Sequence, residues 1–419
     1  MSARRPPFLA AALAVALAPL AAHAVTLDDA ITLALKHDPG LRRAQAEEGA
    51  ARARLSQARA GWLPTITLEG SIAKAPTDFG GFFGFGREDL TPSTAGVELR
   101  QPLFTGGAVS AAIGQAKAGA ASAAAAYDAA RLSLVADVAA AFETVRLTQQ
   151  AIALEERHIE ELGLVVRQAE RRFQDGDAPH TDVDQANARL AAGRADLARV
   201  QGDEAAAEAR YQTIVGVDPV GLETPTTPSG LPANVNEAVA KAEAANPTLA
   251  AARSALDAAD RGVSKARADG APTIALVASA ASVRDRFLPG YRADAAVIGV
   301  EGRWALFDGA HAGRVAEAVS GRAAAQASLD QARDATQEAA IEAWHALATA
   351  RAVSLAAADQ AKAADAALAN VREEVRVAEK PTLDLLDAER EALAARIGVL
   401  RAEAATVVAA YRLLAVVGG

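Results

Sequence analysis

The sequence predicts a mixed α and β chain that is internally duplicated, with four membrane β-strands and two long antiparallel helical hairpins. Similar landmarks recur in the same order, about 200 residues apart, which indicates a tandem repeat. Short segments of alternating apolar and polar residues indicate the strands, and very long proline-free stretches indicate the helices. The matched landmarks are Asp38-Pro39 and Asn246-Pro247, Gln101–Gly107 and Ala305–Ala310, and Thr181–Val183 and Leu383–Leu385.

The N-terminus has the pattern of a cleaved signal peptide. Arg4 and Arg5 precede an apolar stretch that ends in Ala22-His23-Ala24, a small-x-small cleavage site. The stretch is shorter than the roughly 20 residues that a membrane-spanning helix requires. We therefore expect residues 1–24 to be removed during export and the mature chain to begin at Val25.

The composition narrows the class of protein. The formal net charge is −9 and only 4% of residues are aromatic, a combination that argues against a nucleic-acid partner. The chain has no cysteine, which excludes disulfides and thiol catalysis. Alanine-rich helices pack closely but bury little apolar area each, so contacts between copies are expected to contribute to stability.

The first repeat is expected to begin with two helices that are separated at Pro39, with Thr26 as the N-cap of the first. Two strands and a long helical hairpin should follow, and the hairpin turns at a Gly-Asp-Ala-Pro segment. At ~1.5 Å per residue, the first helix of this hairpin would span roughly 100 Å. The predicted elements of the repeat, residues 25–216, are helices over 26–36 and 41–60, strands near 64–73 and 94–104, and a hairpin over 108–216.

A proline-rich segment joins the repeats, and the second repeat has the same order of elements. Its hairpin turns at Glu379-Lys380-Pro381. Its first strand is more uniformly apolar than the others and is therefore the least clearly marked. The predicted elements are a linker over 217–236 and a second repeat over 237–419, with strands near 272–280 and 295–304 and a hairpin over 308–416.

The strands alternate with period two, so each should have one apolar and one polar face. We expect the apolar face toward lipid and the polar face toward a water-filled lumen. The predicted lipid-facing residues are Ile66, Leu68, Val97, Leu99, Ile298 and Val300. The predicted lumen residues are Glu69, Glu98, Arg100, Glu301 and Arg303.

Four strands are too few to close a barrel, and an open sheet edge cannot face lipid. Three copies would supply twelve strands, enough to close around a water-filled lumen. Their helical hairpins would then lie side by side around a hollow space. The sequence thus predicts a homotrimer, with a 12-stranded β-barrel in lipid that continues into an α-helical tunnel.

At this point the chain resembles the TolC-like outer-membrane efflux proteins. The resemblance is carried by the repeat, by QPLFTGG and ALFDGA, and by the hairpin tips RRFQDGDAPHTDV and VRVAEKPTLDLLDAER. It implies an outer-membrane exit duct with a long periplasmic extension, without catalytic activity or cofactor. It also implies two kinds of partner: a periplasmic adaptor (membrane fusion protein) and an inner-membrane transporter, ABC-type or proton-driven.

The resemblance also assigns a gate at the periplasmic tip. The acidic constriction falls on Asp384 and Asp387, although their place near the start of a helix also suits a helix-dipole role. The first-half partners fall on Thr181 and Asp182, and the basic gate position on Lys380, where the family often has arginine. The adaptor-contact tips fall on Asp175, Gly176, Asp177, Ala178, Ala378, Glu379 and Pro381.

Other functions find less support in the sequence. No catalytic motif occurs, and the six histidines are not at metal-ligand spacing from one another, so no catalytic or metal site is predicted. A periplasmic adaptor is an alternative, but it would need Gly-rich lipoyl-like β segments. Within the duct interpretation, the segments TDVDQANARLAAGRADL and YQTIVGVDP favour type I protein secretion, with multidrug or small-molecule efflux as the alternative.

Overall fold

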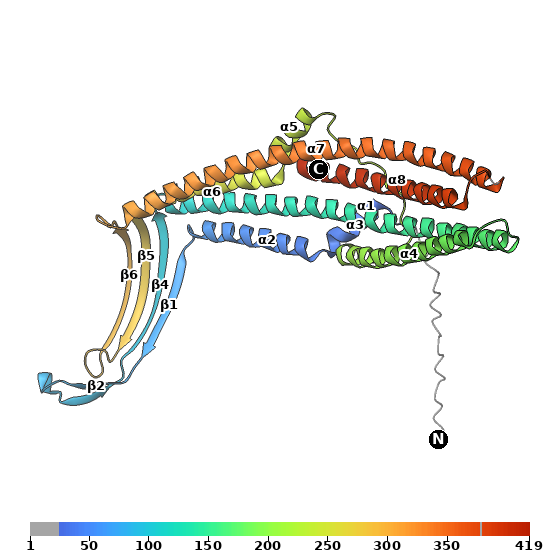
Figure 1. The fold of residues 1–419 in the computed structure, drawn as a ribbon. Coiled ribbons are helices and arrows are strands. Elements are labelled where there is room, and N and C mark those ends of the chain that lie inside the picture. Colours follow the sequence, from blue (N-terminus) through green and yellow to red (C-terminus); the bar gives the residue numbers. More distant parts are fainter. Residues whose placement is uncertain (1–24, 378) are drawn as a thin grey trace, which may run out of the picture. The chain divides into compact units, whose positions relative to one another are not determined.

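The computed structural model in Figure 1 describes residues 25–377 and 379–419, so the predicted signal peptide and Ala378 lie outside the described residues. The chain forms two compact units, and each takes segments from both sequence repeats. None of the helices in the described residues combines the length and apolarity that a membrane crossing requires. The tip unit contains residues 25–37, 138–226 and 366–400, and the strand unit contains 38–137, 227–365 and 401–419.

The strand unit contains an antiparallel four-stranded sheet with the order β1-β4-β5-β6. Figure 1 shows these strands side by side. The structure confirms all four predicted strands, including the apolar one, which extends four residues beyond its predicted end at 280. The bounds are β1 Thr65–Ile72, β4 Ser93–Phe104, β5 Thr273–Arg284 and β6 Arg292–Arg303.

The segment between β1 and β4 is more ordered than the sequence indicated. The glycine- and phenylalanine-rich sequence here is typical of a flexible loop, but β2 (Ala75–Asp78) and β3 (Arg87–Leu90) pair as a separate hairpin. The rings of Phe79 and Phe85 contact each other at 5.9 Å between centroids. Aromatic contacts across a short turn stabilise such a hairpin. The glycines between the phenylalanines made this contact hard to predict from the sequence.

The duplication is visible in how two helices of the strand unit begin. Helices α2 (Pro39–Ala60) and α6 (Pro247–Ala268) each start with proline after a capping residue. The side chain of Asp38 accepts a hydrogen bond from the Leu41 N–H at 2.5 Å, and that of Asn246 accepts one from Leu249 at 3.1 Å. Proline is suited to the first helical position because its missing N–H has no partner there.

Helix α5 (Val235–Ala245) begins inside the segment that we predicted as linker. The side chain of Asn234 accepts a hydrogen bond from the Glu237 N–H at 2.9 Å, so the N-cap lies two residues, and the first helical residue one residue, before the predicted linker end at 236. The prediction placed this boundary by proline content and missed the N-cap signal of asparagine.

The sheet leads into the long helices through tight turns. Between β4 and α3 (Ala108–Gln174), Gly106 has a φ of +61°, and a Cβ there would collide with Ala271. Only glycine fits this left-handed position so close to another segment. The left-handed turn at the junction of strand and helix therefore explains the glycine at position 106 of the QPLFTGG motif. Helix α7 (His311–Arg376) follows β6 in the second repeat.

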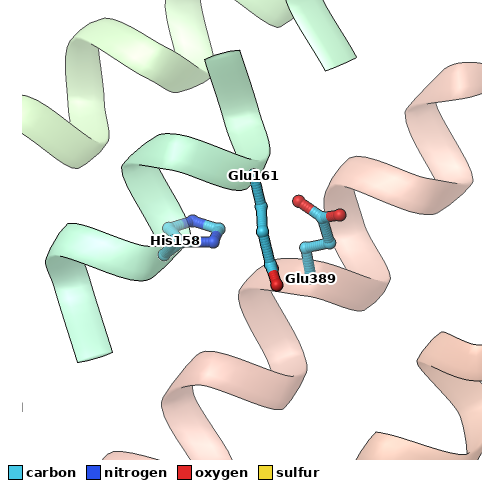
Figure 2. A group of neighbouring side chains, drawn as sticks. All are labelled: His158, Glu161 and Glu389. Carbon is cyan, nitrogen blue, oxygen red and sulfur yellow. The ribbon is translucent and has the colours of Figure 1, made fainter. Parts of the chain in front are cut away.

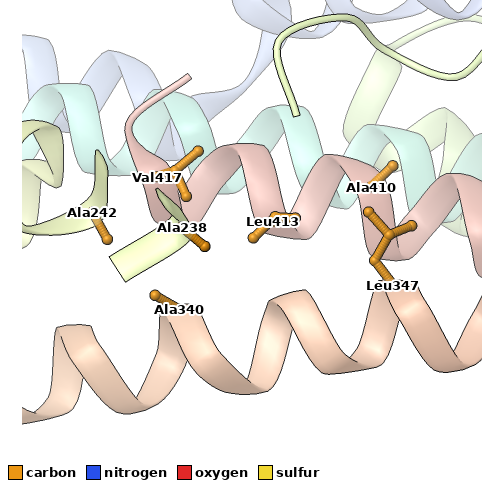
Figure 3. Packing of buried hydrophobic residues seen from close by; sticks show 7 residues of the cluster. All are labelled: Ala238, Ala242, Ala340, Leu347, Ala410, Leu413 and Val417. Atoms are coloured by element: carbon orange, nitrogen blue, oxygen red, sulfur yellow. The ribbon is translucent and has the colours of Figure 1, made fainter. Parts of the chain in front are cut away.

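Alanine allows the helices of the strand unit to pack closely. Figure 3 shows a buried cluster formed by α5, α7 and the end of α8 (Thr382–Val417). Most of its members are alanine, so the gain per side chain is small and the packing relies on close approach of the backbones. The cluster consists of Ala238, Ala242, Ala340, Leu347, Ala410, Leu413 and Val417.

The tip unit has a core of larger side chains. Helix α1 (Leu27–His37) packs on α4 (His180–Val215), and the rings of Phe142 and Tyr211 lie 6.4 Å apart, both fully buried. The predicted N-cap is confirmed, because the Thr26 hydroxyl accepts a hydrogen bond from the Asp29 N–H at 3.2 Å. The Asp29 carboxylate accepts one in return from the Thr26 N–H at 3.3 Å.

We expect Gly216→Ala to destabilise the tip unit by about 1–2 kcal/mol. Gly216 ends α4 with a φ of +88°, and a Cβ there would lie 2.6 Å from the His37 ring. Gly202→Ala is the matched control, since Gly202 lies within α4 and a Cβ there meets nothing within 4 Å. This control should be neutral or stabilising, by up to about 1 kcal/mol. Thermal unfolding followed by circular dichroism measures both, and equal unfolding temperatures would contradict the prediction.

Candidate gate and strand face

The strand register brings the predicted apolar residues to one face of the sheet. Ile66 lies opposite Leu99, and Leu68 lies opposite Val97. Across the sheet, Leu99 pairs with Ala278, which pairs with Ile298. The side chains of Leu68 and Ile298 are 82% and 75% exposed, although both are fully apolar. A continuous exposed apolar face of this kind indicates contact with lipid or with another protein surface.

The opposite face carries the five charged residues that we predicted for the lumen. The register places Glu69, Glu98 and Arg100 on the same face as Glu301 and Arg303. The Arg100 guanidinium donates to the Glu301 carboxylate at 3.0 Å, and Arg303 donates to it at 3.2 Å. Arg100, Glu301 and Arg303 therefore form a linked group of charges on this face. Within the described residues, the outer edges of β1 and β6 have no strand partner.

The two hairpin tips in the tip unit differ in geometry. At the first, Gly176 has a φ of +83°, and the N–H of Asp177 donates to the carbonyl of Arg172 at 2.8 Å. This closes α3 with a left-handed glycine, and Ala178-Pro179 then leads into α4. At the second, the Glu379 N–H donates to the Glu374 carbonyl at 2.8 Å, and Pro381 precedes α8. Ala378, predicted as part of this tip, lies outside the described residues.

Asp384 and Asp387 lie in the first two turns of α8. The Asp387 carboxylate accepts a hydrogen bond from the Arg189 guanidinium of α4 at 2.9 Å. The predicted basic position, Lys380, instead contacts Glu374 at 2.9 Å. This hydrogen bond to Glu374 raises the pKa of the Lys380 ammonium group. Among the contacts of the described residues, the cation that contacts Asp387 is Arg189, which we did not predict.

A sequence signal for Arg189 existed. Asp182 lies in the first turn of α4, and Arg189 follows it seven residues later. Residues seven apart lie on the same stripe of a helix, so Arg189 shares the face of Asp182. Thr181 is exposed next to Asp182 in the same turn. Searching that face for a cation, rather than the hairpin turn alone, would have added Arg189 to the candidate gate residues.

Comparisons with known proteins agree with this architecture. The sequence profile of the family described as outer membrane efflux protein matches residues 30–217 and 238–419. The outer membrane efflux protein BepC of Brucella suis is 30% identical over 409 residues, which are 95% of this chain and 86% of BepC. Protein CyaE of Bordetella pertussis is 31% identical over 341 residues, which are 78% of this chain and 70% of CyaE.

A solved structure has the same fold. The outer membrane protein VceC of Vibrio cholerae matches with a TM-score of 0.80 and 21% identity, over 94% of this chain and 96% of that chain. The family profile matches two stretches of the chain, and the unmatched residues between them, 218–237, overlap the predicted linker over 218–236.

Proposed function

Because the chain belongs to the outer membrane efflux protein family, we propose that three copies form the exit duct of a tripartite export machine. Members of this family are transport channels of the outer membrane with a long periplasmic helical tunnel. The finer proposal is that a periplasmic adaptor docks at the hairpin tips and an inner-membrane transporter, ABC-type or proton-driven, delivers the cargo. Membership of this family argues against the alternative that the chain is itself a periplasmic adaptor.

The observation that carries the proposal is the four-stranded sheet, which has faces of opposite polarity and, in the part of the chain that the structure describes, two unpaired edges. An unpaired edge in lipid leaves backbone N–H and C=O groups without partners, which is unfavourable by several kcal/mol per group. Pairing of β6 of one copy with β1 of the next removes this penalty. Twelve strands, four from each of three copies, form a barrel wide enough for a water-filled lumen.

We place the gate of the duct at the tip unit. Three copies would bring the Asp384 and Asp387 carboxylates together as two rings of like charge. In each copy Arg189 holds Asp387 and so connects α4 to α8. Thr181, Asp182 and Lys380 lie near the start of the same two helices. Opening would require these helices to move apart, so the ion pair between Arg189 and Asp387 stabilises the closed arrangement.

For the cargo, we favour protein secretion, because residues 181–197 and 211–219 resemble the secretion branch of the family. Efflux of small molecules is the second candidate, since BepC, 30% identical over 95% of this chain, is named an efflux protein. Deletion of the gene in its native host separates these candidates. Loss of specific proteins from the culture supernatant supports secretion, whereas increased sensitivity to toxic compounds with an unchanged supernatant supports efflux.

The duct itself is tested by the mass of the protein extracted in detergent from outer-membrane fractions. Light scattering corrected for detergent should give a trimer, and the same material should conduct ions across a planar lipid bilayer. A monomer, or a protein found only in the soluble periplasmic fraction, would contradict the closure of a shared barrel.

A further inference from the structure

Three potential metal ligands converge inside the tip unit, on helices α3 and α8. His158 and Glu161 are three residues apart on α3, so both side chains lie on one face of that helix. Glu389 comes from α8. One ligand atom from each of the three side chains lies within 4.8 Å of the other two. Figure 2 shows the side chains of His158 and Glu161 pointing toward Glu389.

Glu389 is the most informative member of this group. It is 3% exposed, and its Oε1 accepts a hydrogen bond from the Arg372 guanidinium at 3.3 Å. Its other oxygen, Oε2, is buried without a hydrogen-bond partner in the described residues. A buried carboxylate oxygen without a partner is uncommon in folded proteins, and each case needs a physical reason. A cation bound between this oxygen, His158 and Glu161 would supply one.

The neighbouring Arg372 makes only long contacts with the two carboxylates of the group. One nitrogen of Arg372 lies 3.5 Å from Glu161 and 3.3 Å from Glu389. Charge-assisted hydrogen bonds are usually about 2.7–2.9 Å long, so both contacts are weak. Two carboxylates therefore share one distant guanidinium. The charges of Arg396 and Asp196, which are of opposite sign, also act on the His158 imidazole.

A cavity gives the group access to water and ions. Its volume is about 230 Å³, and His158 forms part of its wall. Metal sites need an open path and room for water molecules that complete the coordination. Of the three proposed ligands, His158 is the one that lines this cavity. The wall also includes the carboxylates of Glu155 and Asp196 and the guanidinium groups of Arg189 and Arg390.

We propose that His158, Glu161 and Glu389 bind a divalent transition-metal ion, for which Zn²⁺ is the representative. Zn²⁺ accepts imidazole nitrogen and carboxylate oxygen together, with water in the remaining position. Mg²⁺ and Ca²⁺ prefer oxygen ligands alone, so the imidazole disfavours them. The sequence analysis missed this site because it compared histidines only with one another. A bound ion would fasten α8 to α3.

The test measures Zn²⁺ binding to the purified full-length mature chain, in competition with a chromophoric chelator. We expect about one ion per chain with a dissociation constant of about 1 μM or less, as such donor sets give when they are preorganised. His158→Gln and Glu389→Gln should each weaken binding at least about tenfold, because each removes a ligand. Glu160→Gln and His345→Gln are the matched controls, since both residues are exposed and outside the group.

Arg372→Gln distinguishes a metal site from a structural ion-pair group. Removing a cation that competes for both carboxylates should tighten Zn²⁺ binding about tenfold, which corresponds to about 1.4 kcal/mol. Absence of saturable Zn²⁺ binding, or equal binding in the wild type, His158→Gln and Glu389→Gln, would overturn the proposal.

Glu161→Gln replaces Glu389→Gln if the latter fails to fold, because Glu161 is only partly buried. The visible absorption of bound Co²⁺ provides an independent readout of the ligands. It should change with His158→Gln and stay unchanged with His345→Gln, and the reverse result counts against the site.

Discussion

Replacing Leu68 with arginine is expected to prevent the chain from assembling in the outer membrane. Leu68 is 82% exposed on the apolar face of the sheet, in register with Val97. An arginine on the lipid side of a membrane barrel costs about 2–4 kcal/mol near the bilayer centre. In a trimer, the three arginines would together cost about 6–12 kcal/mol, which is comparable with the free energy of unfolding of a typical domain. The trimer fraction in detergent extracts, measured by light scattering, should fall accordingly.

The neighbouring residue provides the control. Thr67 lies on the other face of the same strand, opposite Glu98. Thr67→Arg adds the same charge one residue away, and it places that charge on the proposed water side beside a carboxylate. We therefore expect normal amounts of trimer. Equal assembly of Thr67→Arg and Leu68→Arg would contradict the assignment of the two faces, and loss of both would point to a packed interior on both sides.

The strands and their two faces could be predicted because one rule determines both. A period of two places alternate side chains on opposite faces of the sheet. A face that lines a water-filled lumen has few apolar residues, so the apolar set must lie on the other face. Ile66 and Leu99, from different strands, were thus assigned to one face and occur as a direct pair. The register between β4 and β5 could not be derived in this way, because the long turns and helices between them leave the alignment free.

The partners of the tip residues were harder to predict because they depend on contacts between helices. The sequence placed Asp384 and Asp387 on α8, but the partner of Asp387 is chosen by how α4 and α8 pack. The same limit applies to His158 and Glu389, which are 231 positions apart in the chain. Local spacing reveals helical faces, but not which faces meet. The hairpin of β2 and β3 was missed for a different reason, because glycine-rich turns mask the pairing of short strands.

Removing the ion pair between Arg189 and Asp387 is expected to shift the channel toward its open state. The two side chains are partly exposed, 35% for Arg189 and 58% for Asp387. An exposed pair of this kind contributes about 0.2–1 kcal/mol. Three copies that move together would contribute about 0.6–3 kcal/mol, a change of about 3-fold to 150-fold in the open-to-closed ratio. Single-channel recordings of Arg189→Gln in planar bilayers measure this ratio directly.

Arg194→Gln is the matched control for charge, since Arg194 is an exposed arginine of the same helix α4. A double-mutant cycle with Asp387→Asn then isolates the pair from the repulsion within the proposed acidic ring. Removing Asp387 also relieves that repulsion, so Asp387→Asn alone is expected to open the channel less than Arg189→Gln. Once Asp387 is neutral, Arg189→Gln should have little further effect. Additive effects of the two changes would mean that Arg189 acts on the open-to-closed ratio without Asp387, which would contradict an ion-pair latch at the tip.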